Sequence, residues 1–230
     1  MANRIPHHFL EQPPETINVS FTDFATGKGI VDFFFGTVGG ANRLSETAWY
    51  SDLIFKPGTV STSGTSNQSL DEDFDVDFNK SVTIEGDALA TICYAMDNDE
   101  AGGGFEVFPI IKIRKWDGST ETDIVSVTGV TKTFDMGANV NLAGISSVIL
   151  KIPKTTFKKG ESLRVTVELW QKSNGTSDLE TVFLCDPKGR LTHNMDNLLQ
   201  ARWGHNSNIF DISTLTGAVS TSKIQIPFKT

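Results

Sequence analysis

Residues 160–170 limit most strongly what this chain can fold into. Gly160 interrupts the chain, and apolar and polar residues then alternate without a break. The apolar positions are Leu163, Val165, Val167 and Leu169, and the polar-side positions are Arg164, Thr166, Glu168 and Trp170. A period of two predicts a β-strand with one buried face and one outward face. Burial of the four apolar side chains stabilises such a strand by roughly 1.5–3 kcal/mol each.

The same alternation recurs along the chain and predicts about ten to twelve strands. Thirteen segments are candidates for these strands: 16–21, 30–35, 47–55, 74–78, 82–84, 88–94, 105–116, 123–128, 132–136, 147–152, 160–170, 179–184 and 223–228. Turn signals such as Asp117-Gly118 separate them, and the one helix candidate is short, at 195–203. This regular spacing predicts an all-β protein, an antiparallel β-sandwich of jelly-roll type. We expect one domain over residues 16–230, preceded by an extended N-terminal arm over residues 1–15.

The charge balance limits the classes of partner that this chain is expected to bind. The chain of 230 residues carries a net charge of −8, whereas nucleic acid and anionic membranes attract basic surfaces. The N-terminus has no apolar signal core, and no apolar run approaches the length of a membrane span. We therefore expect no nucleic acid partner, no membrane association and no export.

The two cysteines lie far apart in the sequence. Cys93 sits within the apolar run 90–95, and Cys185 ends the apolar run 182–185. The favoured interpretation is two buried thiols that act as small hydrophobic side chains, and a disulfide between neighbouring strands is the alternative.

The N-terminal arm is a candidate interface. Its prolines make residues 4–14 a poor core strand, and an extended arm of this kind is suited to packing against another chain. The arm residues predicted to make this contact are Ile5, Pro6, His7, His8, Phe9 and Leu10.

Two acidic segments are candidate cation sites. Aspartates alternate with apolar residues at 73–77, so Asp73, Asp75 and Asp77 point the same way, and Asp97, Asp99 and Glu100 occupy a glycine-rich segment. Carboxylates in such groups can bind a hard cation such as calcium. The alternative is a solvated strand face, whose charge also discourages edge-to-edge pairing, and a solvated loop. The residues alone leave a bound metal undecided.

Catalytic signatures are absent from the sequence. The four histidines have no second ligand at metal spacing, and there is no nucleophile elbow, phosphate-binding loop or C-x-x-C motif. We expect no enzymatic activity and no cofactor. The tryptophans Trp49, Trp116, Trp170 and Trp203 are candidates for stacking on sugar rings or for an interface, with a place in the core as the alternative.

Several segments together resemble virion structural proteins of tailed bacterial viruses. They are 23–36, 47–52, 73–78, 86–90, 158–164, 185–190 and 224–229. The resemblance spans roughly residues 20–230 and implies a jelly-roll sandwich on a capsid or tail, oligomeric and without enzymatic activity. It implies a chain made in the host cytoplasm and located in the virion, where its partners are copies of itself and other virion proteins.

Three functions follow as hypotheses. The first is a viral structural protein of the capsid, decoration or tail type. The second is a carbohydrate-binding module, with or without calcium, and the third is a glycan-cleaving enzyme on the same fold. The third requires two carboxylates facing each other across a cleft, which a sequence alone cannot reveal.

Overall fold

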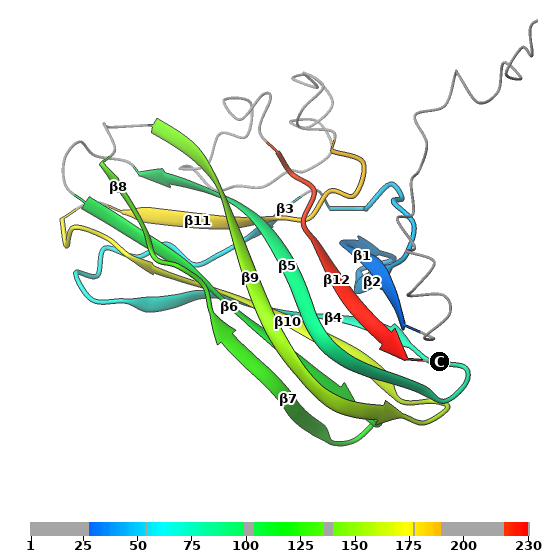
Figure 1. Ribbon diagram of the computed structural model, residues 1–230. Coiled ribbons are helices and arrows are strands. Elements are labelled where there is room, and N and C mark those ends of the chain that lie inside the picture. The colour runs from blue at the N-terminus through cyan, green and yellow to red at the C-terminus, as the bar shows by residue number, and fades with distance from the viewer. Residues whose placement is uncertain are drawn as a thin grey trace, which may run out of the picture.

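The computed structural model describes residues 28–53, 55–98, 104–135, 140–176, 178–189 and 219–229. These residues form twelve β-strands and no helix (Figure 1). The strands are β1 Lys28–Val38, β2 Ala41–Ser45, β3 Phe55–Pro57, β4 Asn67–Asp77, β5 Val82–Asn98, β6 Gly104–Trp116, β7 Glu121–Thr128, β8 Lys132–Asp135, β9 Val140–Phe157, β10 Ser162–Lys172, β11 Leu179–Leu184 and β12 Lys223–Lys229. The all-β prediction is confirmed. The predicted arm (1–15), first strand (16–21) and helix (195–203) lie outside the described residues.

Hydrogen bonds join the strands into one sheet. The order is β3-β11-β5-β12-β1-β2-β4-β10-β6-β7, with β9 paired to β5 and β8 paired to β6. Neighbours are antiparallel except β2 and β4, which pair in parallel where Arg43 lies opposite Asp75. The sheet is therefore mixed, and not purely antiparallel as the sequence predicted.

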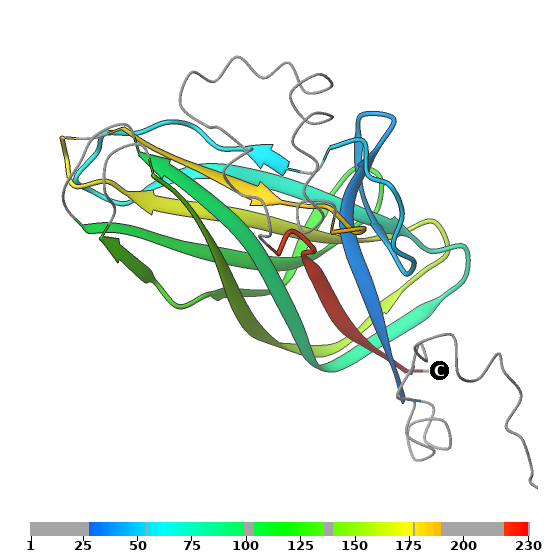
Figure 2. The ribbon, with the colours of Figure 1, turned by 90° about the horizontal axis from the view of Figure 1, so that it is seen from above.

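The sheet curls back so that the part with β11, β5 and β9 lies over the part with β4, β10, β6 and β7 (Figures 1 and 2). The rings of Phe35, Phe74 and Phe183, from β1, β4 and β11, meet between the facing parts with centroids 5.0–5.7 Å apart and near-perpendicular planes. Phe78, which follows β4, packs edge-on against Phe157 of β9 with centroids 5.1 Å apart. Each such pair adds about 0.5–1.5 kcal/mol beyond the area that it buries.

The alternating segment at 160–170 folds as predicted. Leu163, Val165, Val167 and Leu169 of β10 are fully buried in the core. The strand lies between β4 and β6 and pairs with both over most of its length. Because both of its edges are covered, its outward residues are also shielded, and Thr166 and Glu168 are buried as well.

Two strand predictions differ from the structure. Of the predicted strand 47–55 only the end is a strand, because Ser51 Oγ accepts the backbone N–H of Thr37 at 2.8 Å and the segment crosses beside β1. The predicted pair 82–84 and 88–94 forms the single strand β5. Gly86, with φ of +124°, lies at a register shift between β5 and β9, so the strand continues past the glycine.

Pro109 lies within β6, where its lack of an N–H group removes one possible hydrogen bond between strands. Pro109 pairs with Leu169 of β10 on one side of β6. On the other side it falls between β8, which pairs with residues 104–107, and β7, which pairs with residues 110–116. Its missing N–H therefore meets a gap in the pairing, and its carbonyl accepts the N–H of Gly129 at 2.7 Å.

Candidate functional site

Polar side chains gather on the outward face of β4, β10, β6 and β7, which we call the charged face. Cross-strand register places Asp75, Arg164, Arg114 and Asp123 in one row across the four strands. The charged face consists of Asp73, Asp75, Asp77, Lys112, Arg114, Trp116, Glu121, Asp123, Arg164, Thr166, Glu168 and Trp170. It contains the predicted outward row of β10 and three of the predicted cation ligands.

Arg164 is the centre of the charged face. Its Nε and Nη2 each lie 2.8 Å from an oxygen of Asp75, and its Nη1 lies 3.0 Å from Glu121 Oε1 and 3.2 Å from Asp73 Oδ2. The guanidinium carbon lies 4.7 Å from the centroid of the Trp116 ring. Hydrogen bonding to Asp75 raises the pKa of Arg164 above its ordinary value, so Arg164 is a permanent cation within this network.

Arg114 is a second cation in the same row. Its Nη1 lies 2.9 Å from Glu121 Oε2, and its Nε lies 2.9 Å from Asp123 Oδ1 as an ion pair without hydrogen-bond alignment. Glu121 therefore bridges the two arginines through its two oxygens. A shared carboxylate between two guanidinium groups ties β6, β7 and β10 together.

The predicted cation ligands of β4 have partners within the chain. Asp73 accepts the Thr166 hydroxyl at 2.5 Å, Asp75 accepts Arg164, and Asp77 accepts the Ser162 hydroxyl at 2.6 Å. Within the described ranges no group of three or more His, Cys, Asp or Glu side chains is arranged to hold a metal ion. Each of these three aspartates thus has a hydrogen-bonding partner on β10.

The second predicted cation segment is only partly described. Asp97 belongs to β5, where its backbone lies opposite Glu180 of β11. Asp99 and Glu100 lie outside the described residues.

Glu168 is a buried carboxylate on the charged face, with an exposed fraction of 4%. Lys112 donates to its Oε1, and the Trp170 indole N–H donates to its Oε2 at 2.9 Å. Because both carboxylate oxygens have a donor, the cost of burying this charge is offset locally.

The rings of two of the four predicted stacking tryptophans contact other side chains of this chain. Trp116 lies under Arg164, and Trp170 stacks on Phe108 with ring centroids 6.2 Å apart and planes 10° apart. Trp49 packs against Gly36, where an added Cβ would lie 2.6 Å from its ring. Trp203 lies outside the described residues, as do the predicted interface residues of the arm, Ile5, Pro6, His7, His8, Phe9 and Leu10.

The opposite side of the molecule carries an apolar surface that the sequence analysis did not identify. Leu89 of β5 and Ile145 and Ile149 of β9 point outward with exposed fractions of 37%, 47% and 60%, and we call these three residues the apolar face. Leu89 lies directly opposite Ile149 in the ladder. The signal that could have found this face is the unbroken apolar run 148–150, which is typical of a strand covered on both sides.

Neither cysteine forms a disulfide and both are buried, which confirms the favoured interpretation. The Cys93 thiol lies 3.5 Å from the carbonyl of Thr221, and the Cys185 thiol lies 3.9 Å from the carbonyl of Leu53. Burial raises the pKa of Cys93 to about 11, against the opposing effect of a hydrogen bond with Ser222. Cys93 therefore remains a protonated thiol at neutral pH.

No protein-family model and no curated protein matches this chain. Solved structures resemble it at low identity. An α-amino acid ester hydrolase is 10% identical with a TM-score of 0.51, and the match covers 87% of this chain and 36% of that one. A CocE/NonD family hydrolase from Staphylococcus aureus is 10% identical with a TM-score of 0.49, covering 89% and 37%. A structure of infectious bursal disease virus, Gx strain, is 9% identical with a TM-score of 0.29, covering 88% and 36%.

The chain spans little more than a third of the length of these solved chains. The likeness to the α-amino acid ester hydrolase is a likeness of fold alone, at 10% identity. No helix in the described ranges is both long and apolar enough to cross a membrane.

Proposed function

We propose that this chain is a non-enzymatic structural subunit of a virion, a jelly-roll β-sandwich that assembles with copies of itself and with other virion proteins of a tailed bacterial virus. The sequence resemblance over residues 20–230 supports the virion assignment. Such a subunit acts by presenting surfaces to its neighbours, through its N-terminal arm and through its sheets. It uses no cofactor and binds neither nucleic acid nor membrane.

The observation that carries the proposal is the apolar face. Ile149 and Ile145 expose 60% and 47% of their surface, and Leu89 lies directly beside Ile149 on the neighbouring strand. Adjacent exposed aliphatic residues on a rigid sheet favour a protein–protein contact, because covering them removes apolar area from water. The surface is on regular strands, so its shape is fixed before a partner arrives and little order has to be gained on binding.

The charged face supports the same function in a different way. Its carboxylates are engaged by Arg164, Arg114 and Lys112, and Glu121 joins two of these cations. A face of this kind contributes rigidity across β4, β10, β6 and β7. Ion pairs between strands suit a subunit that must keep its shape while it contacts several neighbours.

The jelly-roll assignment is part of the proposal. Twelve strands, a sheet that curls back on itself and an aromatic core between the facing parts support it. We expect an experimental structure of an assembly to resolve two packed sheets with Greek-key connections.

Assembly with mutated surfaces tests the function. We expect deletion of residues 1–15 to leave the thermal unfolding of the monomer unchanged and to abolish incorporation into particles purified on a density gradient. The Leu89→Asp/Ile149→Asp variant should fold and also fail to incorporate. Val130→Asp changes an apolar residue that is 68% exposed elsewhere, and is the matched control that should incorporate normally. Unchanged incorporation of both the deletion and the double variant would overturn the proposal.

A further inference from the structure

Two turns at one end of the molecule are joined by backbone hydrogen bonds. The turn after β4 and the turn after β9 lie side by side, because Gly160 N–H donates to the carbonyl of Phe78 at 2.8 Å and Phe78 N–H donates to the carbonyl of Glu161 at 3.1 Å. The Ser81 hydroxyl adds a bond to the carbonyl of Phe157 at 2.9 Å. The two turns therefore form one rigid end of the sheet.

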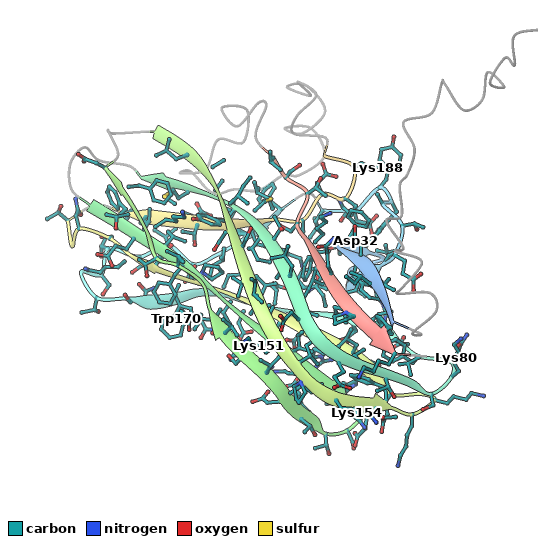
Figure 3. All side chains as sticks on the ribbon, in the orientation of Figure 1. Asp32, Lys80, Lys151, Lys154, Trp170 and Lys188 are labelled. Atoms are coloured by element: carbon teal, nitrogen blue, oxygen red, sulfur yellow. The ribbon has the colours of Figure 1, made fainter. Side chains whose placement is uncertain are left out.

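This end carries a group of exposed lysines. Lys80 belongs to the first turn, Lys158 and Lys159 belong to the second, and Lys154 precedes the second on β9. We call these four residues the basic end. Figure 3 shows Lys80 and Lys154 at this same end of the molecule.

The acidic residues near the basic end already have hydrogen-bond or ion-pair partners within the chain. Glu161 accepts Lys115 Nζ and the backbone N–H of Lys158, each at 2.7 Å. Glu85 accepts Lys229, and Asp77 accepts Ser162. None of the four lysines of the basic end forms an ion pair with another described residue, so their charge is left for a partner.

We propose that the basic end binds an acidic face of a second copy of this chain. The net charge of −8 becomes −12 when these four positive charges are set aside, so the rest of a second copy carries an excess of negative charge that the basic end can attract. Attraction between exposed charges acts within about 8 Å at physiological salt. The positive charge of the basic end, and not the net charge of the chain, therefore determines which surface it attracts. The inference rests on the proposed function, for which it names one contact between copies.

The contact joins two different surfaces of the chain. It can repeat head-to-tail into a ring or an open chain, or close as a two-fold dimer in which each basic end meets the acidic face of the other copy. It is distinct from the apolar face, which lies on the outward side of β5 and β9. A subunit with two different surfaces can extend an assembly in more than one direction.

Nucleic acid is the other polyanion to consider, and the residues favour it less. The basic end consists of lysines alone, without the arginine forks that bind phosphate in two places or the exposed aromatic side chains that stack on bases. Binding to a carboxylate surface requires only compact positive charges in a fixed arrangement, and the two hydrogen-bonded turns supply this arrangement.

Self-association of the full chain tests the proposal. Sedimentation velocity at 50 mM and 500 mM NaCl should show oligomers that weaken at the higher salt. The Lys80→Glu/Lys158→Glu/Lys159→Glu variant should weaken association by about tenfold or more. The variant Lys132→Glu/Lys151→Glu/Lys188→Glu makes the same change in net charge at exposed lysines elsewhere, and should associate like the unmodified chain. Thermal unfolding of each variant checks the fold.

Zero-length carboxyl–amine cross-linking of mixed ¹⁴N and ¹⁵N chains identifies the contact without any substitution. Links between copies at Lys80, Lys154, Lys158 or Lys159 support the proposal. A monomer at both salt concentrations, or equal weakening by both triple variants, overturns it. The proposal is also overturned if a labelled oligonucleotide binds the unmodified chain, the basic-end variant loses this binding, and no oligomer forms. If the basic-end variant still incorporates into particles but the arm deletion does not, this inference fails and the proposed function stands.

Discussion

The guanidinium of Arg164 binds both oxygens of the Asp75 carboxylate, with Nε 2.8 Å from Oδ1 and Nη2 2.8 Å from Oδ2. The two residues lie directly opposite each other on β10 and β4, although 89 positions separate them in the sequence. A two-point ion pair of this geometry fixes the register of two strands as well as their charge.

Loss of this pair should destabilise the fold measurably. Both side chains are mostly shielded, with exposed fractions of 16% and 23%. We expect Arg164→Ala and Asp75→Ala each to lower the free energy of unfolding by about 1–3 kcal/mol, because each leaves a partly buried charge without its partner. Urea unfolding of both single variants and the double variant gives the coupling energy, which should be about 1 kcal/mol or more.

The pair of Arg43 and Asp77 is the matched control. It joins neighbouring parts of the same surface at 3.3 Å, but its side chains are 47% and 64% exposed. We expect a coupling energy below about 0.5 kcal/mol there, since water and salt screen the interaction. Equal coupling energies in the two cycles would show that shielding does not determine the strength of these pairs.

The inward face of β10 could be predicted from the sequence, but the partners of its outward face could not. Leu163, Val165, Val167 and Leu169 could be assigned to the buried face because their alternation with polar residues is a local property of the sequence. Pairing of Asp75 with Arg164 depends on which strand lies beside β4, and that is decided by the whole topology. Read alone, the aspartates of β4 fit either a cation site or a solvated strand face, and the pairing of Asp75 with Arg164 appears only in the structure.

The apolar face shows a related limit. The segment around Val148 predicts a strand, and β9 contains it. Which side of β9 meets the core depends on the curl of the sheet, and both sides carry aliphatic residues. The outward exposure of Ile149 therefore emerges only from the structure.

Gly144 is required by the ring of Tyr94. The two residues are paired between β9 and β5, and an added Cβ at Gly144 would lie 2.6 Å from Tyr94 Cζ. We expect Gly144→Ala to destabilise the protein by about 1–3 kcal/mol, because a fully buried ring has no space into which to move. Thermal and urea unfolding measure the effect.

Two comparisons make this prediction specific. Gly29→Ala changes a strand glycine with no atom within 4 Å of the added Cβ, and should shift stability by less than about 0.5 kcal/mol. In a Tyr94→Leu background the Gly144→Ala substitution should lose most of its cost. A full cost in that background would mean that the backbone, and not the ring, excludes the methyl group.

Stability should decline at alkaline pH because of Cys93. Burial raises the pKa of this thiol from 9.0 to about 11, so the folded protein holds the proton more tightly than the unfolded chain does. The associated stability is complete below pH 9 and is lost as the pH rises towards 11, on the order of 2 kcal/mol in total. Urea unfolding across this range should show the decline, and Cys93→Ala should reduce its slope, with the remainder above pH 10 due to Tyr94, whose pKa burial raises to about 12. An unchanged slope in Cys93→Ala would contradict the assignment.

Tyr94 carries a buried hydroxyl that has no hydrogen-bond partner among the described residues. Its burial raises the pKa of the phenol from 10.0 to about 12. Removal of the hydroxyl removes the cost of burying a polar group that gives up its hydrogen bonds to water on folding. Tyr94→Phe should therefore leave the free energy of unfolding unchanged or increase it by up to about 1 kcal/mol at pH 7. The tyrosinate absorbance that appears with a pKa of about 12 should disappear in the same variant. A loss of more than about 1 kcal/mol would show instead that the hydroxyl donates to an internal water, since a satisfied buried group is costly to remove.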